Sequence, residues 1–180
     1  MRAIFLDIDG VLNCKNTANP RKLPYVIDDK LLKRFQRVVD RTGAKVILSS
    51  TWRYDPAGLF SARYWGIPFC DITPDLPDKP RREEILSWLE KQPDVERFAI
   101  IDDEDDGLDD LPLFQPSSRT GLTEEIAKGV EAYLTGEADK DMRCGRMQRP
   151  ECESAFRGFD VARTTALERI VEIPSGCGDR

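Results

Sequence analysis

Short, continuous apolar runs recur along the chain, each one bounded by polar residues or turn signals. The clearest are residues 3–8 (AIFLDI), 45–48 (KVIL) and 98–101 (FAII). Runs of this length that lack alternation are typical of strands buried on both faces of a parallel sheet. Weaker signals predict a brief strand within residues 67–73 (IPFCDIT) and another at 111–114 (LPLF).

Between these runs the apolar residues recur at the spacing of an amphipathic helix. Helices are predicted within residues 27–43, at 56–65, at 80–91 and at 122–134. The predicted caps and stops are Asp28 or Asp29, Thr123, Gly43 and Gly136. Strands that alternate with helices in this way predict an α/β fold with a doubly wound, Rossmann-like parallel sheet.

The three strong strands all end in residues that can bind metal or phosphate. Asp7 lies at the end of the first run and Asp9 two residues beyond it, Ser49 follows the second run, and Asp102 and Asp103 follow the third. In doubly wound sheets, ligands bind beyond the carboxyl ends of the strands. Carboxylates and a hydroxyl at this edge suit Mg²⁺, which prefers oxygen ligands, together with a substrate phosphate. One aspartate of the first pair can attack phosphorus while the other moves protons.

Composition narrows the chemistry further. The chain has 180 residues and no histidine, which excludes Ser-His-Asp and Cys-His nucleophile systems and histidine-ligated zinc. The 27 basic and 33 acidic residues give a net charge of −6, so no broad surface for duplex nucleic acid is expected. Five scattered cysteines indicate reduced thiols, and no export signal or membrane span is expected. These features predict a cytoplasmic protein.

With these motifs in order, the sequence resembles the phosphatases of the haloacid dehalogenase (HAD) superfamily. FLDIDGVL resembles the first motif of that superfamily, VILSSTW the second and AIIDDEDD the fourth, and Lys79 is a candidate for the lysine of the third. The resemblance covers about residues 1–135 and implies a HAD-like fold. It also implies a Mg²⁺-dependent phosphomonoesterase that works through an aspartyl-phosphate.

The resemblance implies roles for the residues of the first two motifs. Asp7 would be the nucleophile and a metal ligand. Asp9 would be the general acid and base, and it would bind Mg²⁺ through its backbone carbonyl. Ser49 would hydrogen-bond the phosphoryl oxygens, with help from the backbone amide of Ser50.

The remaining motifs supply metal ligands and a cation. By the same resemblance, Asp103 would be the main ligand of the fourth motif and Asp102 would orient water or ligand, with Asp106 as a further candidate acid. The cation should offset the repulsion between the nucleophile and an incoming phosphate dianion. Lys79, at the start of a predicted helix, is favoured for this role, and Arg81 is the alternative.

The intervals between the motifs bear on the substrate. They leave no room for a sizeable cap domain, only for a flap near residues 13–25. Capless HAD enzymes often act on large substrates. The SSTWR and TGLTEE segments resemble HAD domains associated with RNA-repair proteins, which favours a nucleic-acid end or nucleotide phosphate. Arg53, Arg21 and Lys22 are candidates to contact such a polyanion. The alternatives are a phosphoprotein phosphatase and a non-catalytic binding module.

The chain is predicted to divide into a catalytic domain and an extension. Residues 1–135 hold every motif, whereas 136–180 are polar and irregular, with one predicted helix at about 160–172. An extension of this size seldom sustains a core alone, so docking on the core or on a partner is expected. The oligomeric state is left open.

Overall fold

A parallel five-stranded sheet forms the centre of the protein, whose computed structural model describes residues 1–137. The strand order is β3-β2-β1-β4-β5, with every pairing parallel. The strands are β1 (Arg2–Leu6), β2 (Lys45–Leu48), β3 (Phe69–Ile72), β4 (Arg97–Ile101) and β5 (Leu113–Phe114). The predicted α/β fold is confirmed, and no sizeable cap interrupts the described residues.

The central strand β1 is apolar on both faces. Ala3 and Phe5 pack into one hydrophobic cluster, whereas Ile4 and Leu6 pack into the cluster on the other side of the sheet. All four side chains are fully buried. This alternation follows from the period of two in a strand, and it explains why the first motif begins with a continuous apolar run.

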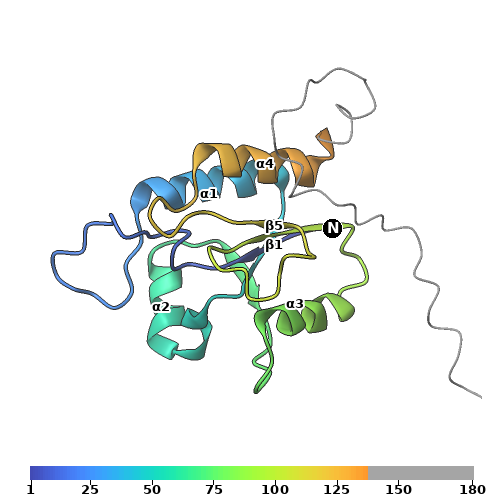
Figure 1. Cartoon of the computed structure of the whole chain (residues 1–180), viewed down its shortest axis with the longest axis horizontal. Helices are drawn as coiled ribbons and strands as arrows, with labels where there is room; N and C mark the ends of the chain where they lie inside the picture. The colour runs from blue at the N-terminus through green and yellow to red at the C-terminus, as the bar shows by residue number, and fades with distance from the viewer. Residues whose placement is uncertain (138–180) are drawn as a thin grey trace, which may run out of the picture. The chain divides into compact units, whose positions relative to one another are not determined.

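Helices cover the two faces. Helices α1 (Asp29–Thr42) and α4 (Glu124–Thr135) lie together on one face, and α3 (Arg81–Glu90) lies on the other (Figure 1). The helix α2 (Pro56–Tyr64) follows a short 3₁₀ helix, η1 (Thr51–Tyr54). The caps are as predicted, with Asp28 and Thr123 accepting hydrogen bonds from backbone amides at the N-termini and with left-handed Gly43 and Gly136 at the C-termini.

Two local features differ from the prediction. The first strand ends at Leu6 rather than continuing to residue 8, because the chain turns there toward Gly10, which has a φ of 72°. The η1 helix was not predicted, since four residues with one buried tryptophan show no helical period. Both features lie at the carboxyl edge of the sheet and alter where its side chains point.

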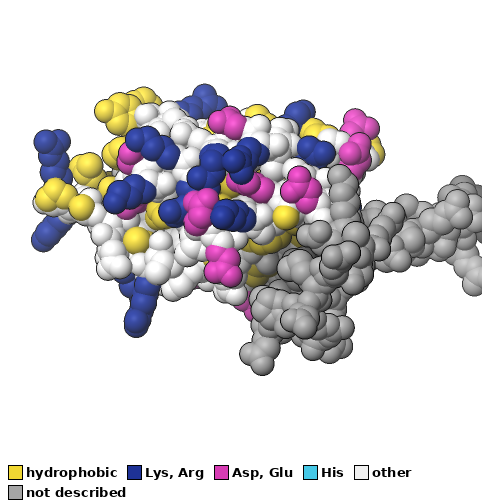
Figure 2. Space-filling model, turned by 90° about the horizontal axis from the view of Figure 1, so that it is seen from above, with side chains coloured by type: hydrophobic (Ala, Val, Ile, Leu, Met, Phe, Trp, Pro, Cys, Tyr) yellow, Lys and Arg dark blue, Asp and Glu magenta, His cyan; other side chains and the backbone are white. Residues whose placement is uncertain are grey.

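The face formed by α1 and α4 carries interleaved basic and acidic side chains (Figure 2). Arg34 and Arg37 of α1 pair with Glu124 of α4, and Arg41 pairs with Glu131. The pair of Arg37 and Glu124, whose side chains are 39% and 47% exposed, is of the surface type that contributes about 0–1 kcal/mol. On this face, therefore, basic side chains lie beside acidic partners.

The predicted extension, residues 136–180, with its helix at about 160–172, falls almost entirely outside the described residues. Within residues 1–137, the longest helices are too short and too polar to cross a membrane.

Candidate active site

Three aspartates meet at the carboxyl edge of the sheet, beyond β1 and β4. Asp7, Asp102 and Asp103 each offer a carboxylate oxygen, and these oxygens lie within 4.8 Å of one another. The backbone holds the group in place, because the Asp7 amide donates to the Ile101 carbonyl at 2.9 Å. The predicted convergence of the first and fourth motifs is thus observed in space.

Gly10 makes room for this cluster. Its φ of 72° lies in the left-handed region, and a Cβ at this position would overlap the carboxyl group of Asp103. A larger residue would therefore have to displace Asp103, the acid contributed by the other strand. The glycine of the first motif keeps the two halves of the cluster close together.

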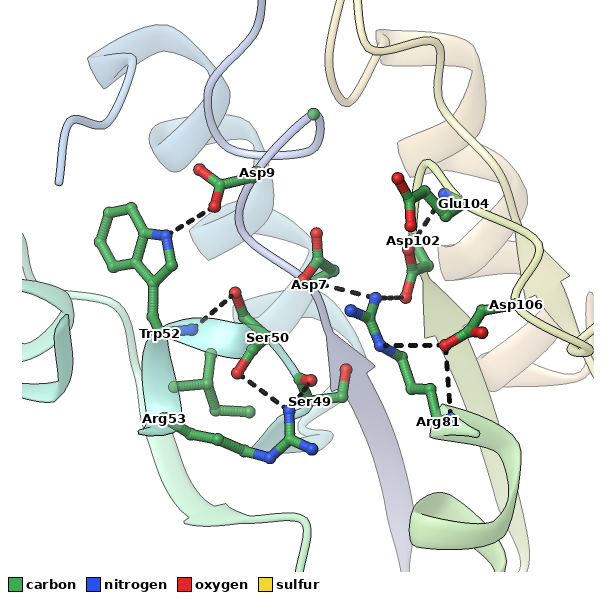
Figure 3. A network of polar contacts seen from close by, with 12 residues as sticks. Asp7, Asp9, Ser49, Ser50, Trp52, Arg53, Arg81, Asp102, Glu104 and Asp106 are labelled. Carbon is green, nitrogen blue, oxygen red and sulfur yellow. Dashed lines mark hydrogen bonds and ion pairs between the residues drawn. The ribbon is translucent and has the colours of Figure 1, made fainter. Parts of the chain in front are cut away.

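Arg81, at the first turn of α3, reaches into the cluster (Figure 3). Its Nη1 forms an ion pair with Asp102 and lies 3.5 Å from Oδ1 of Asp7. Asp106 accepts a hydrogen bond from the backbone amide of Arg81 at 3.3 Å, and its Oδ2 lies 4.0 Å from Nε. One guanidinium thus faces the acids that follow β1 and β4.

Asp9 stands apart from the three-carboxylate cluster and is exposed. The indole Nε1 of Trp52 donates to its Oδ2 at 2.8 Å, and the Asn13 amide donates to its Oδ1 at 2.7 Å. Both carboxylate oxygens therefore have N–H partners (the tryptophan is drawn in Figure 3).

A pocket of about 480 Å³ opens above these residues. Asp7, Asp9, Asp103 and Arg81 all line it, so the nucleophile, acid and cation candidates share one cavity. The rest of the lining consists of Gly10, Asn13, Cys14, Lys15, Thr51, Glu104 and Ser118.

Residues 3–127 match the family model described as the HAD domain in Swiss Army Knife RNA repair proteins. The chain belongs to this family. The match confirms the resemblance drawn from the motifs and supports a phosphatase-type HAD function. A search of curated proteins gives no match.

The electrostatics of this HAD domain fit the divalent metal that HAD proteins typically use. Burial raises the pKa of Asp7 to about 7, and neighbouring Asp102 and Asp9 add to this, while Arg81 and a hydrogen bond from Ser50 oppose it. Burial also raises the pKa values of Asp102 and Asp103. Carboxylates this close are more stable when a cation neutralises them, and all three offer oxygen ligands.

Lys79, the favoured cation of the third motif, does not reach the cluster. Its side chain is 52% exposed and pairs with Glu83 at 3.1 Å, one turn along the chain. The alternative, Arg81, occupies the place expected for Lys79, because the first turn of α3 directs position 81 toward the strand ends. The structure therefore places Arg81, and not Lys79, beside the carboxylate cluster.

The two serines after β2 are fully buried, and they differ in their contacts. The Ser49 amide donates to the Leu6 carbonyl at 2.9 Å, and its hydroxyl has no hydrogen-bond partner within the described chain. The Ser50 hydroxyl accepts from the Trp52 amide at 3.4 Å and so caps η1, and the Ser50 side chain also opposes the rise in the pKa of Asp7. Ser50 is thus the hydroxyl that the structure brings to the nucleophile candidate, and the phosphoryl-binding role of Ser49 stays a prediction.

Arg53 was expected at the mouth of the site, but it is only 7% exposed and does not line the pocket. It forms a buried ion pair with Glu84, and its Nη1 donates to the carbonyl groups of Ser49 and Ser50. The structure does not place Arg53 at the mouth of the site, because η1 turns its side chain beneath the strand end and away from solvent. Its contact with substrate stays a prediction.

Several pocket residues, among them two of the flap and one of a distant loop, were not predicted from the sequence. Asn13, Lys15 and Ser118 come from the flap and from the loop before α4, and the Lys15 amide donates to the Ser118 carbonyl at 3.0 Å. No periodicity marks such loop residues. For Asn13 and Lys15, the one indication in the sequence is that the flap directly follows the first motif.

Proposed function

We propose that this HAD domain is a Mg²⁺-dependent phosphomonoesterase that forms an aspartyl-phosphate on Asp7. The observation that carries the proposal is the position of Asp7, which lines the pocket beside the Arg81 guanidinium and the carboxylates of Asp102 and Asp103. A purely structural role would not require three buried or half-buried acids at one edge of the sheet, whose pKa values burial raises.

Asp7, Asp103 and Asp102 are the residues that would hold Mg²⁺, together with the backbone carbonyl of Asp9. When bound, Mg²⁺ would neutralise the carboxylates and the negative charge of the phosphoryl group. The pKa of Asp7, about 7 without a cation, would fall beside one, and this would favour the ionised nucleophile.

In the first step, a carboxylate oxygen of Asp7 attacks phosphorus and the bond to the leaving oxygen breaks. Asp9 donates a proton to that oxygen, so the alcohol leaves neutral. In the second step, Asp9 takes a proton from water, whose oxygen attacks phosphorus and breaks the bond to Asp7. Inorganic phosphate leaves, and both aspartates return to their starting states.

Arg81 provides the positive charge that lets a phosphate dianion approach Asp7. Its guanidinium cannot lose its proton near neutral pH, and its planar donors match phosphoryl oxygens. The Ser50 side chain, which already opposes the rise in the pKa of Asp7, would help to keep the nucleophile ionised, and Ser49 would bind a phosphoryl oxygen. These groups act mainly by positioning and by stabilising charge.

The proposed substrate is the phosphorylated end of a nucleic acid, or a nucleotide phosphate. The description of the family as domains of RNA repair proteins supports this choice. The absence of a sizeable cap among residues 1–137 leaves the pocket accessible to a polymer end. Lys15 in the pocket lining adds a cation suited to a neighbouring phosphate.

The test is phosphate release by the full chain, with Mg²⁺ or with EDTA. The panel contains an aryl phosphate, mononucleotides, oligonucleotides phosphorylated at the 3′ or 5′ end, and phosphopeptides. Asp7→Asn removes the nucleophile, and Asp40→Asn is the matched control because Asp40 lies exposed on α1.

We expect Mg²⁺-dependent release that is lost in Asp7→Asn and retained in Asp40→Asn, with an oligonucleotide end as the best substrate. Preference for phosphopeptides would instead identify a phosphoprotein phosphatase. No release from any member of the panel by folded protein would favour a non-catalytic binding module.

A further inference from the structure

The geometry points to Trp52 as a positioning residue that orients the Asp9 carboxyl for proton transfer to the leaving group. This inference rests on the proposed function, in which Asp9 is the general acid. It starts from the 2.8 Å hydrogen bond between the indole Nε1 and Oδ2 of Asp9.

The indole is held firmly in place. Trp52 is only 3% exposed, and its ring meets that of Tyr25 edge to face at a centroid distance of 4.8 Å. The Tyr25 hydroxyl bonds Asp55, and the Tyr25 carbonyl accepts from the Trp65 indole at 3.3 Å. The N–H that faces Asp9 is therefore a fixed donor, with little freedom to follow the carboxyl if Asp9 turns away.

Asn13 fixes the other side of the same carboxyl. Its Oδ1 accepts from the Gly10 amide at 3.0 Å, which directs its Nδ2 toward Asp9 and the Val26 carbonyl. All of the polar groups of the Asn13 side chain are thus engaged. With one oxygen bound to Trp52 and the other to Asn13, the Asp9 carboxyl has a set orientation although it is exposed.

This orientation matters because a general acid must be aimed at the oxygen that it protonates. An alkyl or nucleoside leaving group depends strongly on that proton. An aryl leaving group such as nitrophenolate departs with little help. Loss of orientation at Asp9 should therefore slow nucleoside phosphates selectively, whereas a general loss of structure should slow both substrates equally.

The test compares kcat/KM of the full chain for a nucleoside monophosphate and for nitrophenyl phosphate. Trp52→Phe removes the N–H and keeps most of the ring. We expect a loss of about 10-fold with the nucleotide and a change within about twofold with the aryl ester. In Asp9→Asn the same Trp52→Phe change should add nothing further, since the general acid that the indole orients is gone.

Trp88→Phe is the matched control. Trp88 is also buried, and its Nε1 donates to Asp71 Oδ2 at 2.8 Å, but neither residue lines the pocket of Asp7. This variant loses the same type of hydrogen bond and should leave the ratio of the two kcat/KM values unchanged. If Trp52→Phe does not fold, benzothienylalanine at position 52 removes the N–H and keeps the ring shape.

An NMR measurement separates this inference from the proposed function. In ¹H–¹⁵N spectra, the indole signal lost in Trp52→Phe belongs to Trp52, and Asp9→Ala should shift that signal but not that of Trp88. An unmoved Trp52 signal, or an unchanged substrate ratio in an active Trp52→Phe, overturns the inference. If the signal shifts but the wild type releases no phosphate, the proposed function and the positioning role both fail, and the contact alone stands.

Discussion

The guanidinium of Arg81 faces two carboxylates at the pocket floor, while Lys79 pairs with Glu83 in solvent. We expect Arg81→Ala to lower kcat/KM for an aryl phosphate by on the order of 10²–10³-fold, because it removes charge stabilisation at the reacting phosphate. Lys79→Ala should change the same constant by less than about twofold, as expected for an exposed side chain. Steady-state kinetics at saturating Mg²⁺ provides the measurement.

The reverse ranking of these two variants would return the role of the third motif to Lys79. Arg81→Lys is informative beside them. It keeps the charge but loses the planar donors, so an intermediate loss would assign part of the effect to guanidinium geometry.

Gly10 supports a second prediction about a single residue. Gly10→Ala places a methyl group against the Asp103 carboxyl, so the rise in melting temperature caused by Mg²⁺ should be lost. The control is Gly43→Ala, since Gly43 has a similar φ of 62° and open space at the Cβ position. Both variants carry the left-handed penalty of about 1–2 kcal/mol. A full Mg²⁺ response in Gly10→Ala would contradict the arrangement described for the cluster.

Two secondary-structure elements, η1 and α3, are joined beneath the strand ends by the buried ion pair of Arg53 and Glu84. The two side chains are 3% and 4% exposed. Glu84→Gln leaves Arg53 charged and enclosed, so we expect the free energy of unfolding to fall by about 3–5 kcal/mol. Urea denaturation followed by circular dichroism measures this change.

The neighbouring residue Glu83 gives the comparison on the same helix. Its side chain is 43% exposed and pairs with the exposed Lys79. Glu83→Gln should cost less than about 1 kcal/mol. Equal decreases in the free energy of unfolding of the two variants would show that the buried Arg53–Glu84 pair stabilises the fold no more than an exposed pair does.

The regular elements could be predicted because their signals are local. Three apolar runs marked β1, β2 and β4, and caps such as Asp28 and Thr123 marked the helix ends. The topology of a parallel sheet then brought the acids of the first and fourth motifs to one edge. Hydrophobic pattern and chain connectivity were sufficient for the sheet and the carboxylate cluster.

The side-chain directions at the ends of these elements could not be predicted. Lys79 and Arg81 are two residues apart at a helix start, and only the course of the first turn decides which reaches Asp7. Arg53 follows a motif serine, but η1 directs it beneath the sheet. The contact between Asp9 and Trp52 joins residues 43 apart in sequence, and no local pattern reports it.

For the whole molecule, the carboxylate cluster couples stability to pH. In the metal-free folded state the pKa of Asp7 is about 7, above its ordinary value of 3.8, so between these pH values the folded protein holds a proton that the unfolded chain has lost. The stabilisation from this proton is complete below pH 3.8 and is lost as pH rises toward 7. The slope from this carboxyl is at most about 1.4 kcal/mol per pH unit.

We therefore expect Asp7→Asn to be more stable than wild type at pH 8 in EDTA, with the difference shrinking toward pH 4. Denaturant unfolding across this pH range measures the effect, and Mg²⁺ should reduce the difference at pH 8. Equal stability of the two proteins at both pH values would argue against a buried, unneutralised Asp7.

The hydrogen-bond ladder that continues past the strand ends has a consequence for motion. The Asp7 amide donates to the Ile101 carbonyl, the Ser49 amide to that of Leu6 and the Thr73 amide to that of Leu48. The end of each of these strands thus holds the first residue after the neighbouring strand. Amides held this way, over a core buried on both faces, exchange with solvent deuterium only when the sheet opens. The residue proposed to carry the phosphoryl group would then be as immobile as the core, and rearrangement during turnover would be confined to the flap and the phosphate.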